Sequence, residues 1–279
     1  MPDCFDATVL ENKQVAAEKI WRMKLWCPKI AREALPGQFI TIKCEGSTFL
    51  RRPFSVGLVK KKRRLLLFSW GEPCSFFIHY KVVGPGTTWM SQRQKGEEMD
   101  VFGPLGGRGF IVYPHHQAIL VAGGIGLAGL LRLGQAILAE TKTRPILIFG
   151  VKDSRAFFAL PLRSRRLNLQ ICTEDGSLGT KAKATECLEA ALEEYRKQGT
   201  PVMVYAVGPR AMLRETAKIT RERETPCQVL MEEMVGCGIG VCLGCTVPTT
   251  RNDWLKHTPI CTYGPMFWRH EIEWQNLRY

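Results

Sequence analysis

ILVAGGIGLAGLLRLGQAILAE, residues 119–140, is the stretch that decides the fold of the second half of the chain. Its first four residues are apolar and predict a short buried strand, which enters a glycine-rich turn at residues 123–126 and is followed by a helical run to Glu140. The alternation continues downstream, with strands expected at 145–151, 167–172 and 202–207 and helices at 154–160, 185–197 and 210–220. Because alternating strands and helices assemble into a parallel sheet covered by helices, this region is predicted to be an α/β domain.

The glycine-rich turn is also a candidate nucleotide-binding loop. Gly123, Gly124 and Gly126 lie between a strand and a helix, where backbone N–H groups can approach the phosphates of a dinucleotide. The spacing differs from the G-x-G-x-x-G fingerprint, and glycines that serve only a tight turn are the alternative. Gly208, followed by Pro209, closes a later strand at the same carboxyl edge of the sheet. Two loops at one edge predict a binding site there.

The residues before this domain are typical of a β-barrel. Short apolar runs, several of them alternating with polar residues, are separated by Gly and Pro and are expected as strands at 17–27, 38–44, 54–59, 65–70, 76–83 and 98–102. About six short strands of this kind predict a closed antiparallel barrel.

A basic run, Lys60 to Arg64, lies between two of these expected strands. The chain has a net charge of +13, so a nucleic-acid-binding patch has to be considered. Because apolar runs flank the five charges, we expect them at a hairpin tip, where solvated side chains are tolerated. No aromatic or helical readout element is interleaved with them, so an acidic protein is a better candidate partner than nucleic acid.

A four-residue motif in the barrel suits a flavin nucleotide. Arg52, Pro53, Phe54 and Ser55 follow one another along an expected strand and combine a fixed cation, a ring and a hydroxyl group. Arg52 can bind a phosphate through two N–H groups, and Phe54 offers apolar surface. Ser55 can hydrogen-bond the N5 region of a flavin, which makes it the candidate catalytic residue.

A second motif lies farther along the barrel. Gly86, Thr87 and Thr88 belong to a Gly-Pro-Gly-Thr-Thr sequence that opens an expected short helix, and a helix N-terminus of this kind suits a pyrophosphate. Each motif alone is weak, since Gly-Pro-Gly is usually only a turn. Their order, ahead of a nucleotide-binding fold, favours a flavin.

Four cysteines near the end of the chain predict an iron-sulfur cluster. Cys237, Cys242, Cys245 and Cys261 have the C-x4-C-x2-C spacing, with a distant fourth cysteine, that plant-type [2Fe-2S] ferredoxins use. The glycines between and beside them lack a Cβ, so the loop can fold tightly and direct backbone N–H groups at the sulfurs. The alternative is a zinc site, but zinc sites usually pair two separate C-x2-4-C hooks.

The remaining seven cysteines form no motif, and the first residues, MPDCFDATVLENK, have no apolar core that would indicate a secretory signal. No stretch approaches the roughly 18 apolar residues that a membrane-spanning helix needs. We therefore expect a soluble protein in the reducing environment of the cytoplasm.

The 279 residues are predicted to form three parts: a flavin-binding barrel at 1–112, a nucleotide-binding α/β domain at 113–225 and a [2Fe-2S] module at 226–279. The five histidines form no motif, and no carboxylate pair or nucleophile-base pair is evident in the sequence. We expect hydride transfer, which depends on orientation more than on acid-base groups.

The motifs together resemble the ferredoxin-NADP reductase superfamily. Within it, several pieces closely resemble the electron-transfer subunits of two-subunit, NAD-linked dihydroorotate dehydrogenases, and the likeness runs nearly from end to end. These pieces are LRRPFSV (50–56), VVGPGTTWMS (82–91), DVFGPLGGRGF (100–110), VAGGIGLAGL (121–130), TEDGSLGTK (173–181), VGPRAML (207–213), CGIGVCLGCTVP (237–248) and ICTYGPMF (260–267).

The resemblance implies specific cofactors and a partner. It implies FAD in the barrel, with residues 52–55 at the flavin and residues 86–88 at its phosphates, and NAD at Gly123, Gly124, Gly126 and Gly208. It also implies an FMN-containing dihydroorotate dehydrogenase catalytic subunit as partner, in a heterotetramer with two copies of each chain. Nucleic acid and membranes are not expected partners.

Electron counting agrees with these cofactors. NADH gives up two electrons as a hydride and a [2Fe-2S] cluster carries one, so a flavin has to lie between them. The barrel, the nucleotide sheet and the cluster module take up the whole sequence, so the dihydroorotate site is expected on another polypeptide. Two alternatives stay open: a diaphorase-like subunit of a sulfhydrogenase or of an NADH-dependent ferredoxin:NADP oxidoreductase, and a zinc-stabilised adaptor that is not an enzyme.

Overall fold

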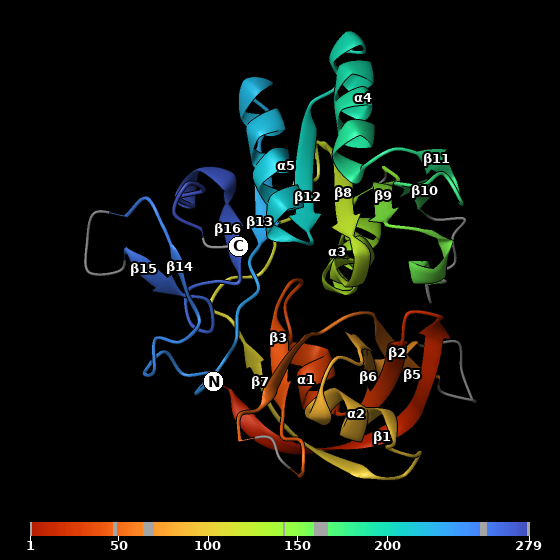
Figure 1. Cartoon of the computed structure of the whole chain (residues 1–279), viewed down its shortest axis with the longest axis vertical. Helices are drawn as coiled ribbons and strands as arrows, with labels where there is room; N and C mark the ends of the chain where they lie inside the picture. The colour runs from red at the N-terminus through yellow and green to blue at the C-terminus, as the bar shows by residue number, and fades with distance from the viewer. Residues whose placement is uncertain are drawn as a thin grey trace.

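The computed structural model describes residues 2–46, 49–63, 70–141, 143–158, 167–251 and 256–277. The N-terminal half forms an antiparallel barrel, and a mostly parallel sheet with its helices stands above it (Figure 1). The C-terminal segment, with the hairpin of β14 (Thr246–Pro248) and β15 (His257–Pro259), lies to one side.

The barrel is formed by one seven-stranded antiparallel sheet. Its strands are β1 (Asp3–Ala16), β2 (Ile20–Trp26), β3 (Phe39–Ile42), β4 (Arg52–Ser55), β5 (Val59–Arg63), β6 (Trp70–Lys81) and β7 (Glu98–Leu105), in the order β4-β3-β7-β1-β2-β6-β5. β4 runs directly into β5, and both of these strands lie at the ends of that order. Between them, the Gly57 N–H donates to the Phe77 carbonyl and the Phe77 N–H donates to the Leu58 carbonyl, each over 2.9 Å. One continuous segment therefore joins the two ends of the sheet, and the predicted barrel is confirmed.

Alternation along the strands explains the core of the barrel. Met23 and Leu25 of β2 are completely buried, while Lys24 between them keeps some exposure; all four residues of β3 are buried. Two short helices, α1 (Pro28–Glu33) and α2 (Pro85–Ser91), connect strands of the barrel. The second is the short helix that the Gly-Pro-Gly-Thr-Thr motif predicts.

Two features of the barrel differ from the sequence-based expectation. β1, a strand of 14 residues, was not predicted, because only Ala7 and Val9 of its length are buried and its apolar alternation is weak. Its stability comes from backbone pairing with β2 on one side and β7 on the other. Lys60 to Arg63 are part of β5 rather than a hairpin tip, since the backbone of this edge strand pairs with β6, and Arg64 lies outside the described residues.

The second sheet carries the expected α/β pattern. Its strands are β8 (Gln117–Gly123), β9 (Ile146–Val151), β10 (Asn168–Thr173), β11 (Thr180–Lys181), β12 (Val202–Val207), β13 (Cys227–Leu230) and β16 (Met266–Trp268), in the order β11-β10-β9-β8-β12-β13-β16. All neighbouring pairs are parallel except β13 with β16. The predicted α/β domain is therefore confirmed.

Helices cover both faces of this sheet. α3 (Leu127–Glu140) packs with Leu120 of β8 on one face, and α4 (Ala184–Lys197) and α5 (Arg210–Glu222) pack with Ile119 and Val121 of the same strand on the other. The helix expected at 154–160 is instead a single 3-10 turn, Ser154–Ala156. Asp153 caps this turn, and Phe157 has already returned to extended backbone; residues 159–166 lie outside the described part.

The segment that carries the four cysteines leaves the second sheet and returns to it. β13 extends the parallel sheet, with Cys227 opposite Val204, and β16 then pairs with β13. The division suggested at residue 226 therefore falls within this sheet rather than between two sheets. No helix in the described part of the chain is long and apolar enough to cross a membrane.

The contact between β7 and the cysteine segment has no space for a side chain at Gly107. A Cβ at Gly107 would lie 1.8 Å from the carbonyl oxygen of Thr262, which is backbone and has little freedom to move. We expect Gly107→Ala to reduce the free energy of unfolding by about 1–3 kcal/mol, as overpacking does. Urea unfolding followed by circular dichroism measures this change.

Gly134, on α3, is the matched control for this substitution. A Cβ there would lie 3.8 Å from the nearest atom, a Cδ of Leu120, which is ordinary van der Waals contact. Gly134→Ala should therefore be neutral or stabilise the chain by up to about 1 kcal/mol, since alanine is the better helix former. Equal stability losses for the two variants would contradict the packing argument.

Candidate functional site

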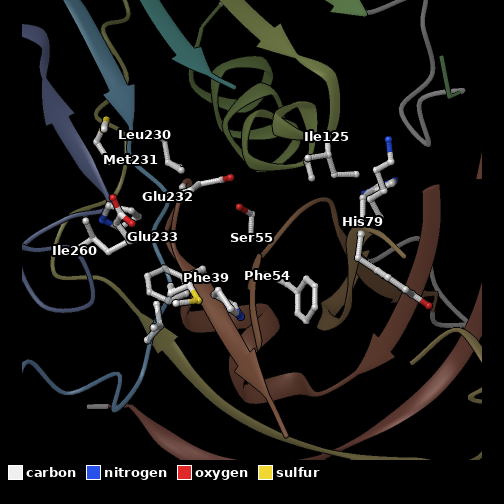
Figure 2. A pocket seen from close by; sticks show the side chains of 18 of the residues that line it. Phe39, Phe54, Ser55, His79, Ile125, Leu230, Met231, Glu232, Glu233 and Ile260 are labelled. Atoms are coloured by element: carbon white, nitrogen blue, oxygen red, sulfur yellow. The ribbon is translucent and has the colours of Figure 1, made fainter. Parts of the chain in front are cut away.

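A central cavity of about 470 Å³ lies where the barrel, the second sheet and the cysteine segment meet. β4 contributes Pro53, Phe54 and Ser55, and the start of α3 with the turn before it contributes Ile125 and Ala128. The opposite wall is the stretch that follows β13, residues 230–235 (Figure 2). Because all three parts of the chain contribute walls, the cavity exists only when they are packed together.

β4 presents the flavin motif to this cavity. Pairing with β3 places Phe54 opposite Ile40 and Ser55 opposite Phe39, and Ser55 lies near the middle of the cavity in Figure 2. The Phe54 ring lies edge-on to Tyr80, with 5.9 Å between the ring centroids. Tyr80 is fixed in turn, because its hydroxyl donates to Asn12 Oδ1 over 2.9 Å. The ring and the hydroxyl group of the motif are therefore held in place by the barrel.

Arg52 is the member of this motif that lies outside the central cavity. It is opposite Ile42, and its Nη1 donates to the carbonyl oxygen of Leu50 over 2.8 Å. Its neighbour Arg51 forms a two-pronged ion pair with Asp100, with both contacts at 2.8 Å. The sequence motif alone did not show which way the Arg52 side chain turns.

A second cavity of about 620 Å³ lies beside the first and shares Val83 with it. Thr88 lines this second cavity and Thr87 lines the central one, while Gly86 is buried between them. The Thr87 hydroxyl accepts hydrogen bonds from the N–H groups of Val83, at 2.9 Å, and Gly84, at 3.3 Å. The turn at residues 83–88 thus contributes residues to the walls of both cavities.

A third cavity, of about 850 Å³, lies at the carboxyl ends of the parallel strands, and we call it the nucleotide cavity. Gly123 and Gly124 line it. Gly124 has φ +52°, which favours glycine, and open space where a Cβ would point. A Cβ at Gly123 would lie 2.6 Å from Pro209, so this glycine serves close packing between the two loops.

Gly126 and Gly208 are not part of the lining. A Cβ at Gly126 would lie 2.7 Å from the Val207 carbonyl oxygen, and one at Gly208 would lie 2.9 Å from the Cα of Gly123. Both glycines therefore allow the loops after β8 and β12 to pack against each other. The sequence predicted four ligand-facing glycines, and the structure places two of them, Gly123 and Gly124, at the cavity.

The nucleotide cavity is rich in carboxylates. The described residues that line it include two lysines, Lys152 and Lys183, and the five glutamates Glu18, Glu174, Glu186, Glu189 and Glu215. Some of these carboxylates are already engaged, since Glu186 accepts from the Lys183 N–H at 2.7 Å and Glu189 pairs with Arg223 at 2.9 Å. A phosphate group beyond the pyrophosphate of a dinucleotide would therefore bind less favourably in this cavity than in a basic pocket.

The four motif cysteines form two pairs. The N–H groups of Cys242, at 3.4 Å, and Ile239, at 3.5 Å, donate to the sulfur of Cys237. Burial alone would raise the pKa of Cys237, but these N–H groups lower it to about 7. The thiol groups of Cys245 and Cys261 interact with each other, and this interaction lowers the pKa of Cys245 to about 6 and raises that of Cys261.

This arrangement suits a two-iron cluster better than a single metal ion. No group of three or more potential ligands among the described residues is arranged to hold one metal ion. A zinc site needs four ligands around one point, whereas a [2Fe-2S] cluster has two irons that share four cysteines. The loop geometry also fits, since Gly238 and Gly240 have φ +77° and +80°, which favour glycine.

Sequence reasoning missed the glutamates that precede the first motif cysteine. Glu232 lines the central cavity as an exposed residue, and partial desolvation by its neighbours raises its pKa. Glu233 also lines the cavity and forms an ion pair with Arg210; burial raises its pKa, although Arg210 opposes the change. The position of Glu232 and Glu233 in the sequence, between a buried strand and Cys237, is the signal that could have identified them.

His79 is a buried residue that lines the central cavity. It is 4% exposed, and neither ring nitrogen has a hydrogen-bond partner in the described part of the chain. Its ring stacks on Phe158, with centroids 5.2 Å apart. Burial, with a smaller effect of nearby Arg22, lowers the pKa of His79 to about 3, so the ring is neutral at ordinary pH.

Comparison with known proteins gives a consistent result. The model of the iron-sulfur cluster binding domain of dihydroorotate dehydrogenase B matches residues 232–273. The electron transfer subunit of dihydroorotate dehydrogenase B (NAD(+)) from Desulforamulus reducens is 34% identical over 99% of this chain and 100% of the relative. The corresponding subunit from Caldanaerobacter subterraneus subsp. tengcongensis is 32% identical over 95% of this chain and 97% of its own length.

Solved structures show the same fold. A chain of the NADH-dependent reduced ferredoxin-NADP oxidoreductase superposes with a TM-score of 0.79 at 23% identity, over 97% of this chain and 91% of that one. The ferredoxin reductase of carbazole 1,9a-dioxygenase superposes with a TM-score of 0.66 at 19% identity, over 80% of this chain and 67% of that one. The likeness extends to the barrel and the second sheet together.

The paired cysteines lead to a test of the cluster ligands. Cys242→Ser should abolish stoichiometric iron and inorganic sulfide in the purified chain, because one iron would lose a thiolate ligand. Bound flavin should remain, since Cys242 does not line the central cavity. Cys4→Ser, which removes an exposed thiol outside the motif, is the control and should keep iron and sulfide. Full iron and sulfide in the Cys242→Ser chain would refute the assignment.

Proposed function

The chain belongs to the family of electron-transfer subunits of NAD-linked dihydroorotate dehydrogenase B, and from this membership we propose its function. It transfers electrons between NAD(H), FAD and a [2Fe-2S] cluster, to or from an FMN-containing dihydroorotate dehydrogenase catalytic subunit of pyrimidine biosynthesis. The observation that carries the proposal is the stretch 230–235, which forms a wall of the central cavity and is followed two residues later by Cys237. A flavin in that cavity would lie beside the cluster loop.

The central and second cavities together fit FAD. The central cavity has the aromatic and apolar walls and the few polar groups that are usual in cofactor sites. We assign Pro53 and Phe54 to the flavin ring, Ser55 to its N5 region, and Gly86, Thr87 and Thr88 to the phosphates. Arg52, at the rim, would have to leave the Leu50 carbonyl to reach a phosphate. When bound, FAD supplies the conversion between two-electron and one-electron transfer.

The residues around the flavin position have separate tasks. Phe54, held by Tyr80, orients a ring in the cavity, and the Ser55 hydroxyl offers a hydrogen bond at its edge. Glu232 contributes an exposed carboxyl group to the wall of the cavity, and partial desolvation by its neighbours raises its pKa. The apolar side chains of Ile125 and Leu230 exclude water from the same space.

The nucleotide cavity fits a nicotinamide dinucleotide without an additional phosphate. Gly123 and Gly124 allow the backbone to approach the pyrophosphate, and Gly126 and Gly208 hold their loops in position. Five carboxylates against two lysines disfavour the 2′-phosphate of NADP. We therefore assign NAD(H) as the nucleotide.

The surface around the cluster loop supports a protein partner. Met234, Ile239, Val241 and Leu243 are 54–75% exposed, although each is a large apolar side chain. Such a group of exposed apolar residues marks an interaction site. We assign it to the catalytic subunit, which would approach the cluster there, in an assembly of two copies of each chain.

The cysteines are consistent with a cytoplasmic location. Each of the eleven lies in the described part of the chain, and none forms a disulfide. A chain with many thiols and an oxidisable cluster is stable in a reducing compartment. We therefore assign the chain to the cytoplasm.

The decisive experiment compares the purified chain with and without the catalytic subunit. Alone, the chain should pass electrons from NADH to an artificial acceptor and show no turnover of dihydroorotate or orotate. Addition of the FMN-containing subunit from the same organism should confer NADH-dependent orotate reduction. Efficient orotate reduction by the chain alone would overturn the proposal, as would failure to couple with that subunit.

A pair of surface variants localises the contact. Val241→Glu places a charge among the exposed apolar residues of the cluster loop and should strongly reduce coupled turnover, with iron and sulfide analysis to verify the cluster. Trp26→Glu changes an apolar side chain of the barrel that is 45% exposed, and coupling should persist. The reverse result would place the partner on the barrel.

A further inference from the structure

The turn between β1 and β2 and the neighbouring end of β6 together reach all three cavities. Glu18 lines the nucleotide cavity and Lys19 lines the second cavity. Lys81, at the end of β6, lies opposite Ile20 and lines the central cavity. The position of the turn is fixed, because the Val82 N–H donates to the Lys19 carbonyl over 3.0 Å. Among the described residues that line the nucleotide cavity, Glu18 alone comes from the barrel.

Glu18 and Lys81 form an ion pair at this junction. Lys81 Nζ lies 2.6 Å from Glu18 Oε2, and the two side chains are 46% and 29% exposed. Ion pairs with this much exposure contribute little to stability, because water and salt screen them. A more highly charged anion can therefore separate the Glu18–Lys81 ion pair at little cost in stability. The pair also links the central cavity to the nucleotide cavity, because each partner lines one of them.

A nicotinamide dinucleotide has to span the nucleotide cavity and the central cavity. Hydride transfer needs the nicotinamide ring in the central cavity, against the flavin position, and Lys81 lines that cavity while Glu18 lines the nucleotide cavity. The pyrophosphate connects the two nucleosides of the ligand, so it comes closest to the junction when both ends are in place. There it meets one carboxylate, which repels it, and one ammonium group, which attracts it.

We propose that the pyrophosphate of the dinucleotide replaces the Glu18 carboxylate as the partner of the Lys81 ammonium group. This inference rests on the proposed function, because it takes NAD(H) as the ligand. Lys81 is a compact cation with three N–H donors, which suit phosphate oxygens as well as a carboxylate. Glu18 holds Lys81 at the junction before the ligand arrives and competes with the ligand afterwards.

If the pyrophosphate replaces Glu18 as the partner of Lys81, substitutions of Lys81 and Glu18 should have opposite effects on NAD⁺ affinity. Lys81→Met should weaken NAD⁺ binding to the FAD-loaded chain by about tenfold or more, as for one lost charged hydrogen bond. Glu18→Gln should tighten NAD⁺ binding severalfold, because it removes both the competitor and the repulsion. Lys81→Arg keeps a cation and should retain most of the affinity. Isothermal titration calorimetry measures all three, with FAD absorbance as a check on the flavin site.

Two controls distinguish an exchange of the partner of Lys81 from a purely structural role of the Glu18–Lys81 ion pair. Lys29 and Glu33 on α1 form an ion pair of 2.8 Å that lines none of the three cavities, so Lys29→Met and Glu33→Gln should leave NAD⁺ affinity unchanged. Adenosine has no phosphate, so Lys81→Met should not change its affinity. If Lys81→Met weakened adenosine as much as NAD⁺, the lysine would only support the fold of the site, and the inference would be overturned.

The other possible results of these titrations distinguish failure of the proposed function from failure of this inference alone. If Glu18→Gln and Lys81→Met both weakened NAD⁺ binding, the ion pair would act by stabilising the conformation of the turn between β1 and β2. The proposed exchange of partners would then be refuted. If the unaltered chain bound no NAD⁺ at all, the proposed function would fail and this inference with it. If the unaltered chain bound NAD⁺ but neither variant changed the affinity, only the exchange would be excluded.

Discussion

The contact between the end of β7 and residues 261–265 is the constraint on which the rest of the structure depends. The Gly106 N–H donates to the Cys261 carbonyl over 3.0 Å, the Arg108 N–H donates to the Gly264 carbonyl over 2.8 Å, and Gly107 has no Cβ to separate the two backbones. Arg108 also forms an ion pair with Glu271 at 2.7 Å. These contacts hold the cysteine segment against the barrel, while β13 and β16 hold the same segment in the second sheet. All three parts are thereby fixed around the central cavity.

This arrangement accounts for the order of electron transfer that we propose. The nucleotide cavity opens at the carboxyl ends of the parallel strands, the flavin motif faces the central cavity from β4, and residues 230–237 lead from that cavity to the cluster loop. Hydride transfer, conversion to single electrons and exit to a partner then take place in adjacent sites. The exposed apolar residues at the cluster loop mark the exit.

The sequence predicted features that depend on residues close together in the chain. It missed features that depend on contacts between residues distant in the sequence. The turn at 123–126, the cysteine spacing and the alternation of strands and helices are local, and the fold class followed from them. β1 was missed because its stability comes from two neighbouring strands rather than from its own pattern. The Glu18–Lys81 pair joins residues 63 positions apart, and Gly126 and Gly208 pack against backbone and do not line the nucleotide cavity. Spacing alone carries no information on these contacts.

The central claim is that electrons reach the cluster from NADH only through a flavin in the central cavity. Electron paramagnetic resonance of the purified chain, frozen after anaerobic addition of NADH, tests this claim most directly. The FAD-loaded chain should develop the signal of a reduced [2Fe-2S] cluster, the FAD-depleted chain should not, and restored FAD should recover the signal. A cluster signal of equal size and rate in the FAD-depleted chain would contradict the account.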